Sequence, residues 1–172
     1  MKICVYGAGV IGGILGSALA RAGHDVSLIA RGAHLEAIRM NGLTVVTPDE
    51  RVNMPLPASA DPADFGVQDL VIVATKTPAF ADVARAVGPL IGPKTLVAFA
   101  VNGVYWFYGD GFRPDGVTIN MDRLDPDGIL HAAIGAERSL GIVCWGGGEI
   151  NEPGVIEATR SGGRFAVGAA MP

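Results

Sequence analysis

A run of six residues near the amino terminus, Gly-Ala-Gly-Val-Ile-Gly, has the composition and spacing of a phosphate-binding turn. It fits the pattern G-x-G-x-x-G, follows a short apolar strand and opens a helical segment. In that setting the glycines allow a tight turn, close approach of a pyrophosphate and helix–strand packing, and the helix start presents free N–H groups to the phosphates. The predicted dinucleotide-binding residues are Gly7, Ala8, Gly9, Val10, Ile11 and Gly12. A glycine-rich turn without a ligand is the alternative.

The next apolar strand, residues 25–30, ends on Arg31. An enzyme that uses NAD carries an acidic residue here, about 20 residues after the motif, to bind the ribose 2′-hydroxyl. A carboxylate would repel a 2′-phosphate, whereas a guanidinium forms charge-assisted, often bidentate hydrogen bonds with it. Arg31 therefore predicts NADP(H), not NAD(H), as the cofactor. The alternative is a solvated arginine at a strand end.

Two further polar residues, Lys76 and Asn102, follow apolar strands at residues 69–76 and 95–103. Ligands of open α/β sheets lie across the carboxyl ends of the strands. Both side chains are therefore expected at the rim that meets the nicotinamide. Two simpler interpretations stay open: the lysine could extend to water, and Asn-Gly could be only a turn.

The elements that must position these residues alternate along the chain. Strands are predicted at 2–7, 25–30, 69–76, 95–103 and 139–145, helices at 11–21, 33–40 and 78–90, and a hairpin at 43–56. Residues 109–138 are expected to be irregular, and 146–168 to form an antiparallel ribbon. This order predicts an α/β, Rossmann-like, doubly wound and mostly parallel sheet, with a small antiparallel ribbon near the C-terminus.

The composition indicates one globular domain. The chain has 172 residues, 49% of them hydrophobic and 17% charged, which is far from a disordered composition. A net charge of −4 argues against a nucleic-acid partner. No apolar run reaches the roughly 20 residues that a membrane span needs, and the N-terminus has no signal-peptide pattern.

The few cysteines and histidines predict neither a disulfide framework nor a metal site. Cys4 and Cys144 each lie in an apolar strand, so we expect buried, unpaired thiols and a cytoplasmic location. His34 and His131 have no partners at metal-ligand spacing, so no metal is predicted.

With GAGVIGG, LIAR, VATK and VNG in this order, the chain resembles the ketopantoate reductases (2-dehydropantoate 2-reductases) over nearly all its length. It corresponds to the amino-terminal NADP-binding domain of that family. The strand-ending lysine, followed at this separation by Asn-Gly, is the more distinctive feature. The resemblance implies catalytic positions for Lys76 and Asn102 beside cofactor and substrate, and a backbone contact from Gly146 to the nicotinamide half. The resemblance also carries over Glu149, near Gly146, as a site residue.

The family reaction is the NADPH-dependent reduction of 2-dehydropantoate to pantoate, in pantothenate biosynthesis. The resemblance implies that residues 1–172 supply the cofactor-binding half, and that the helical C-terminal substrate domain with its general-acid lysine is absent from this chain. We therefore expect the chain alone to be inactive. Its expected partner is a small 2-oxo acid, with no membrane involved, and an uncovered apolar patch would favour a homodimer.

Two other functions stay open at this stage. A reductase of another small 2-oxo acid could use the same domain, because substrate choice lies largely in the second domain. A non-catalytic NADP-sensing module is the other alternative. The aromatic residues 105–108 could wall the substrate cleft or pack under the second domain, and we expect the latter.

Overall fold

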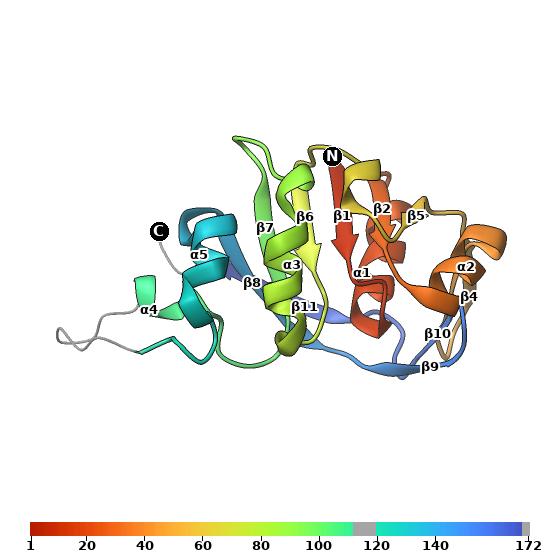
Figure 1. Cartoon of the computed structure of the whole chain (residues 1–172). Helices are drawn as coiled ribbons and strands as arrows, with labels where there is room; N and C mark the ends of the chain where they lie inside the picture. The colour runs from red at the N-terminus through yellow and green to blue at the C-terminus, as the bar shows by residue number, and fades with distance from the viewer. Residues whose placement is uncertain (112–119, 170–172) are drawn as a thin grey trace.

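Two sheets organise the chain, and the computed structural model describes residues 1–111 and 120–169 (Figure 1). Sheet A has the strand order β11-β8-β7-β6-β1-β2-β5, and sheet B has the order β4-β3-β10-β9. Sheet A is parallel except for β11, which runs antiparallel to β8. The predicted Rossmann-like α/β fold with a mostly parallel sheet is confirmed.

The bounds of the elements are as follows. Sheet A consists of β1 (Lys2–Tyr6), β2 (Asp25–Ile29), β5 (Ala58–Ser59), β6 (Leu70–Val73), β7 (Leu96–Ala100), β8 (Ser139–Trp145) and β11 (Arg164–Ala169). Sheet B consists of β3 (Leu43–Val46), β4 (Arg51–Met54), β9 (Gly148–Glu152) and β10 (Val155–Ala158). The α-helices of the described residues are α1 (Val10–Arg21), α2 (Gly32–Asn41), α3 (Phe80–Ala86), α4 (Tyr108–Gly111) and α5 (Ile129–Ala133).

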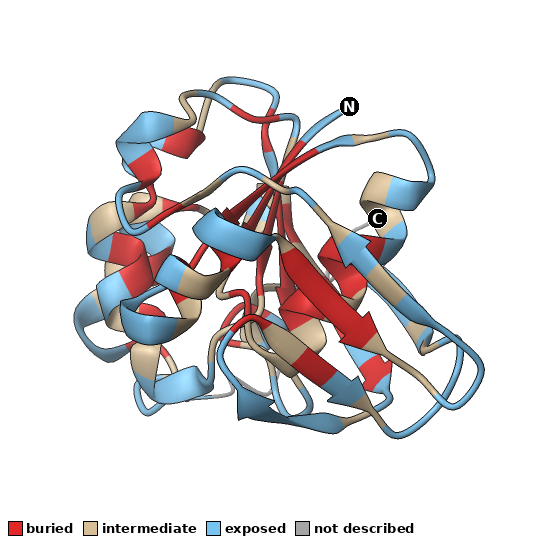
Figure 2. Cartoon of the chain, turned by 90° about the vertical axis from the view of Figure 1, so that its right-hand side faces the viewer, coloured by how far each residue is buried: buried red, intermediate tan, exposed pale blue. Residues whose placement is uncertain are grey.

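The central strands are apolar because both faces of sheet A are covered. Ile3 and Val5 of β1 belong to the core cluster that includes residues of α1, and Cys4 between them belongs to the cluster that includes residues of α3 and α5. Figure 2 shows these strands as the buried centre of the molecule. The sheet therefore forms a rigid support whose strand ends carry the polar residues.

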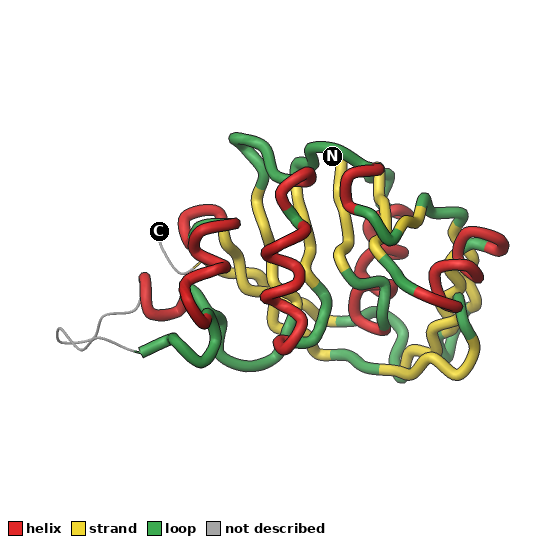
Figure 3. Tube along the Cα trace, in the orientation of Figure 1, coloured by secondary structure: helices red, strands yellow, loops and turns green. Residues whose placement is uncertain are grey.

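The C-terminal part differs from the single ribbon that the sequence predicts. β9 and β10 do form an antiparallel pair, but β10 also runs parallel to β3 and so joins sheet B. The following strand, β11, crosses to the edge of sheet A, as the strand trace in Figure 3 shows. Alternation of side chains indicates a strand but does not say which neighbour it pairs with.

Two smaller differences between the predicted and the observed structure concern the helices. The helix expected at 78–90 is the shorter α3, flanked by the 3₁₀ turns Thr77–Ala79 and Gly88–Leu90. The segment expected to be irregular contains α4 and α5, while its residues 112–119 lie outside the described part of the chain. None of the helices in the described residues is both long and apolar enough to cross a membrane.

The aromatic run also differs from expectation. Trp106 and Phe107 are 1% and 2% exposed and pack on Phe99 of β7, with ring centroids 5.8 and 5.9 Å away. They fill the core of this domain instead of lying ready for a second one. Tyr105 lies against Gly141 of β8, where a Cβ would come within 2.6 Å of the tyrosine ring.

Candidate functional site

The glycine turn connects β1 to α1 at the carboxyl end of sheet A. Gly7 has φ +105°, and a Cβ there would lie 2.8 Å from Cγ2 of Thr75. A Cβ on Gly12 would collide with the carbonyl oxygen of Gly7. In contrast, nothing lies within 4 Å of the Cβ position of Gly9. The chain's own packing therefore requires glycine at positions 7 and 12, and leaves open space over Gly9 for a ligand to approach.

The N–H groups of the turn divide into two sets. Those of Gly7 and Ala8 both donate to the carbonyl oxygen of Ile29, at 3.0 Å. These two residues therefore shape the turn and link it to β2. The N–H groups of residues 9–12, at the start of α1, have no acceptor among the described residues. They are the donors that the motif offers to phosphates, and they add to the positive end of the helix dipole.

Arg31 stands between β2 and α2, as predicted, and its side chain is exposed. The guanidinium forms no ion pair or hydrogen bond within the described residues. The guanidinium also acts on its neighbour Tyr6: burial raises the pKa of the Tyr6 hydroxyl, and Arg31 opposes that rise. An unpaired cation at this strand end suits a 2′-phosphate.

Two adjoining clefts run across the carboxyl ends of the strands. One, here called the His34 cleft, has a volume of about 210 Å³ and includes Tyr6, His34 and Asp82. The other, the Lys76 cleft, has a volume of about 730 Å³ and includes Lys76 and Asn102. The residues that line both are Gly7, Gly9, Arg31, Thr75 and Ala79. The glycine turn is thus the shared floor of one groove, with Arg31 beside it.

Lys76 follows β6 and precedes the 3₁₀ turn at Thr77–Ala79. Its side chain is exposed and forms no hydrogen bond or ion pair within the described residues. Thr75, the residue before it, was not predicted as a site residue. Its hydroxyl is buried without a hydrogen-bond partner in the described structure. The only sequence signal for Thr75 is its place beside Lys76 at the end of a buried strand.

Asn102 makes a double contact between the ends of β7 and β8. Its Nδ2 donates to the carbonyl oxygen of Cys144 at 3.1 Å, and the N–H of Cys144 donates to its Oδ1 at 3.0 Å. An asparagine amide carries two N–H donors, so one of them is left for the Lys76 cleft. Asn102 therefore fixes the cleft wall and still offers a polar group to a ligand.

The structure does not bring Gly146 and Glu149 to the Lys76 cleft. Gly146 lines a separate, mainly apolar cleft of about 400 Å³ between α1, sheet B and β11, which Ile11 also lines. Glu149 lies on β9, where every residue is exposed, and it is opposite Glu157 of β10. Neither residue lines the cleft in which we expect the nicotinamide, so their predicted contact with it stays a prediction.

The groove has the groups that a dinucleotide requires. Open space lies over Gly9, free N–H groups begin α1, and the Thr75 hydroxyl is buried without a partner. Arg31 and Lys76 supply unpaired positive charge at two points along the groove. No group of three His, Cys, Asp or Glu side chains within residues 1–111 and 120–169 could hold a metal ion.

The two cysteines are free and buried, as predicted. Burial raises the pKa of the Cys4 thiol to about 12, and burial also raises the pKa of Cys144. A thiol that stays protonated at neutral pH is a poor nucleophile. Cys144 lines the Lys76 cleft, but its thiol is therefore not a candidate nucleophile, and we assign it a structural role.

The model of the family described as "Ketopantoate reductase PanE/ApbA" matches residues 3–107. The chain belongs to this family. The ketopantoate reductase family is an oxidoreductase family, and the matched residues contain the glycine turn, Arg31, Lys76 and Asn102.

Individual relatives agree with the family match. A 2-dehydropantoate 2-reductase of Mesorhizobium japonicum is 40% identical over 169 residues, which are 98% of this chain and 52% of the relative. A crystal structure from Ralstonia solanacearum, assigned as a ketopantoate reductase, has a TM-score of 0.88 at 39% identity and covers 98% of this chain and 52% of that one. The chain thus spans about half the length of these ketopantoate reductase relatives.

A more distant similarity concerns the fold alone. The structure of D-mandelate dehydrogenase in complex with NADH has a TM-score of 0.75 at 21% identity, over 99% of this chain and 48% of that one. The ketopantoate reductase fold described here is therefore shared with an enzyme whose structure holds NADH.

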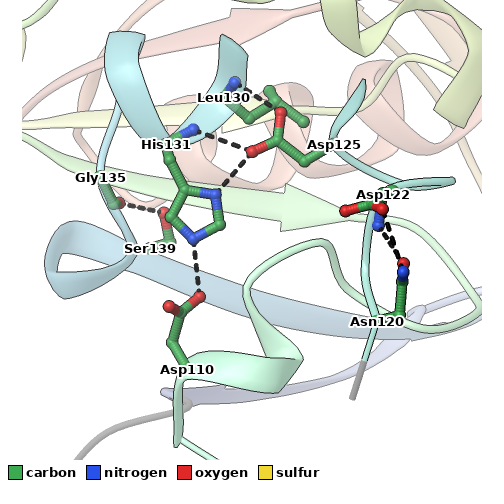
Figure 4. Close-up of polar contacts among 8 residues, drawn as sticks. All are labelled: Asp110, Asn120, Asp122, Asp125, Leu130, His131, Gly135 and Ser139. Carbon is green, nitrogen blue, oxygen red and sulfur yellow. Dashed lines mark hydrogen bonds and ion pairs between the residues drawn. The ribbon is translucent and has the colours of Figure 1, made fainter. Parts of the chain in front are cut away.

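A second cluster of charged groups lies at the other end of sheet A from α2, between α4 and α5 (Figure 4). His131 contacts Oδ2 of Asp125 through Nδ1 at 2.5 Å and Oδ2 of Asp110 through Nε2 at 2.8 Å. The buried Asp125 side chain also accepts the backbone N–H groups of Leu130 and His131. Burial alone would lower the pKa of His131, but the hydrogen bonds to the two aspartates outweigh it and raise the pKa.

Proposed function

We propose that the groove binds NADP(H) and that the chain supplies the cofactor-binding half of a reductase that converts 2-dehydropantoate to pantoate. The observation that carries the proposal is Arg31, an unpaired arginine that lines both clefts of the groove at the end of β2. The N–H groups of residues 9–12 would hold the pyrophosphate, and Arg31 the 2′-phosphate.

The reacting end of the cofactor would lie in the Lys76 cleft. When bound there, the cofactor would supply the hydride that reduces the C2 carbonyl of the 2-oxo acid. Lys76, which lines this cleft, would place a positive charge beside that carbonyl, and the remaining N–H of Asn102 would orient ligand oxygens. Neither residue is proposed as the general acid, which the family resemblance places on a helical domain beyond this one. We therefore expect the 172-residue chain to bind NADPH but to reduce 2-dehydropantoate negligibly.

The first test is calorimetric titration of the chain with NADPH and with NADH at one modest salt concentration. We expect at least tenfold tighter binding of NADPH, about 1.4 kcal/mol, and loss of that preference in Arg31→Ala. Equal affinities for the two dinucleotides would show that Arg31 does not bind the 2′-phosphate and is only a solvated residue at the end of a strand. Failure to bind either one would contradict the assignment of the groove.

A reductase of another small 2-oxo acid is the second candidate. The specific support is the shared fold of D-mandelate dehydrogenase, crystallised with NADH. A panel of 2-oxo acids, assayed with the full-length protein, separates the two substrates. If the chain were a sensing module without chemistry, Lys76→Ala in the full-length protein would change neither turnover nor cofactor affinity, whereas we expect it to lower turnover far more than cofactor affinity.

A further inference from the structure

His34 is the one histidine that lines the groove among the described residues, and the proposed function gives it no role. It lies in the first turn of α2 and is partly buried. Its ring joins two segments that are far apart in the sequence: the glycine turn and the turn between β9 and β10. Both ring nitrogens are therefore engaged by backbone groups.

The two contacts define which nitrogen carries the proton. The backbone N–H of Gly154 donates to Nδ1 at 2.9 Å, so Nδ1 must present its lone pair. Nε2 lies 2.8 Å from the carbonyl oxygen of Ala8, which can only accept, so Nε2 must carry the hydrogen. The ring is thus a neutral imidazole with its proton on Nε2.

The contact with Ala8 fixes the orientation of a whole peptide group. In a trans peptide the C=O and the following N–H point in opposite directions. With the Ala8 carbonyl held toward His34, the Gly9 N–H points the other way, and it is one of the unpaired donors at the start of α1. Because glycine accepts positive and negative φ about equally, Gly9 by itself does not prevent this peptide from flipping. A flip would present a carbonyl oxygen to the anion in place of an N–H.

The other side of the ring is anchored on a rigid turn. Gly154 has φ +82°, and a Cβ there would lie 3.0 Å from Cβ of Ala37 in α2. Its carbonyl oxygen accepts the N–H of Thr44 in β3 at 2.9 Å. The acceptor nitrogen of His34 is therefore held by a glycine that is itself fixed between α2 and sheet B.

From this geometry we infer that His34 is a positioning residue for the cofactor, because it locks the Ala8–Gly9 peptide with the Gly9 N–H toward the pyrophosphate. The inference rests on the proposed binding of a dinucleotide in the groove. It concerns the part that NADPH and NADH share, so it predicts a loss of affinity for both, with the ratio between them unchanged. Arg31, in contrast, is proposed to act on NADPH alone.

The test compares His34→Gln, His34→Asn and His34→Ala in calorimetric titrations with NADPH and NADH. The amide nitrogen of glutamine can reach the place of Nε2 and donate to Ala8, whereas asparagine can only replace Nδ1 and accept from Gly154. We expect Gln to bind within about threefold of the original chain, and Asn and Ala to bind both dinucleotides about tenfold more weakly. Thermal unfolding of the Gln and Asn variants shows whether their stabilities match.

A second measurement does not depend on any variant folding. Long-range proton–nitrogen correlation spectra of the original chain report the tautomer of His34 at neutral pH, and we expect the hydrogen on Nε2. A hydrogen on Nδ1 would overturn the inference. So would equal dinucleotide affinities of Gln and Asn variants of equal stability, while the proposed function would stand. If the original chain binds neither dinucleotide, the proposed function fails, and this inference fails with it.

Discussion

The groove at the glycine turn and the cluster of His131, Asp125 and Asp110 both contain charged and polar groups, but several of those in the groove are unpaired within the described residues, whereas those of the cluster are paired. In the groove, Arg31, Lys76 and the Thr75 hydroxyl have no partners within the described residues. In the cluster, His131 is held by two aspartates, and the side chain of Asp125 accepts three hydrogen bonds from Leu130 and His131 of α5. Unpaired polar groups indicate a place for a ligand. A cluster whose groups are paired with one another indicates a structural role, here the attachment of α4 and the segment at Asp125 to α5.

The difference has an energetic meaning. A buried donor or acceptor that loses its partner costs about 1–3 kcal/mol, whereas an exposed group without a partner contributes little to stability. Substitutions of the unpaired side chains in the groove should therefore change binding more than folding. Substitutions in the cluster should change folding and leave the cofactor affinity intact.

The largest expected effect comes from the glycine turn, where the same substitution has two outcomes. Gly12→Ala places a Cβ against the carbonyl oxygen of Gly7, so we expect a loss of about 3 kcal/mol or more in the free energy of unfolding. Gly9→Ala meets open space, so stability should stay within about 1 kcal/mol while NADPH affinity falls at least about tenfold. Denaturant unfolding and calorimetry measure both quantities. Equal loss of stability in the two variants would contradict this account of the turn.

An intermediate effect is expected at Asp125, whose side chain is 2% exposed. Asp125→Ala leaves two backbone N–H groups and Nδ1 of His131 without their acceptor, so the free energy of unfolding should fall by about 2 kcal/mol. Lys76→Ala is the matched groove variant, and its stability should change by less than about 0.5 kcal/mol. Urea unfolding curves of the two variants test the contrast, which fails if Lys76→Ala is the more destabilised.

The smallest expected effect is the pH dependence of the cluster. Because the folded state raises the pKa of His131, its contribution to stability is complete below the unfolded value of about 6.5 and disappears as the pH rises through the raised folded value. The ring is 41% exposed, so solvent limits the contribution to less than about 1 kcal/mol. His131→Gln should therefore be less stable than the original chain at pH 5.5 and closer to it at pH 8.5. A gap that widens toward alkaline pH in urea unfolding would contradict the sign.

The central sheet and the glycine turn could be predicted because local sequence determines them. A wholly apolar strand such as β6 (Leu70–Val73) is stable only in a sheet that is covered on both faces, and the turn at Gly7 requires a residue that accepts positive φ. Arg31, Lys76 and Asn102 follow from the same reasoning, because parallel strands end at one edge of the sheet.

What could not be predicted depends on pairing between distant segments. Nothing local in the sequence of β10 indicates β3 as its partner, and the single ribbon expected at 146–168 therefore separates into two sheets. The role of His34 was missed for the same reason, since both of its partners are backbone groups without a side-chain signature. The clamp between Asn102 and the backbone of Cys144 is a third case.

The contact between His34 and Gly154 joins residues that are 120 positions apart in the chain. During synthesis on the ribosome, β1 and β2 can pair, and α1 can pack against them, long before Gly154 has been made. At that stage the imidazole has no donor for Nδ1, and nothing on the carboxyl side of the chain holds it toward Ala8. Competence to bind the dinucleotide should therefore arise late in translation, when the β9–β10 turn has emerged and docked against α2, and not when the glycine motif itself first folds.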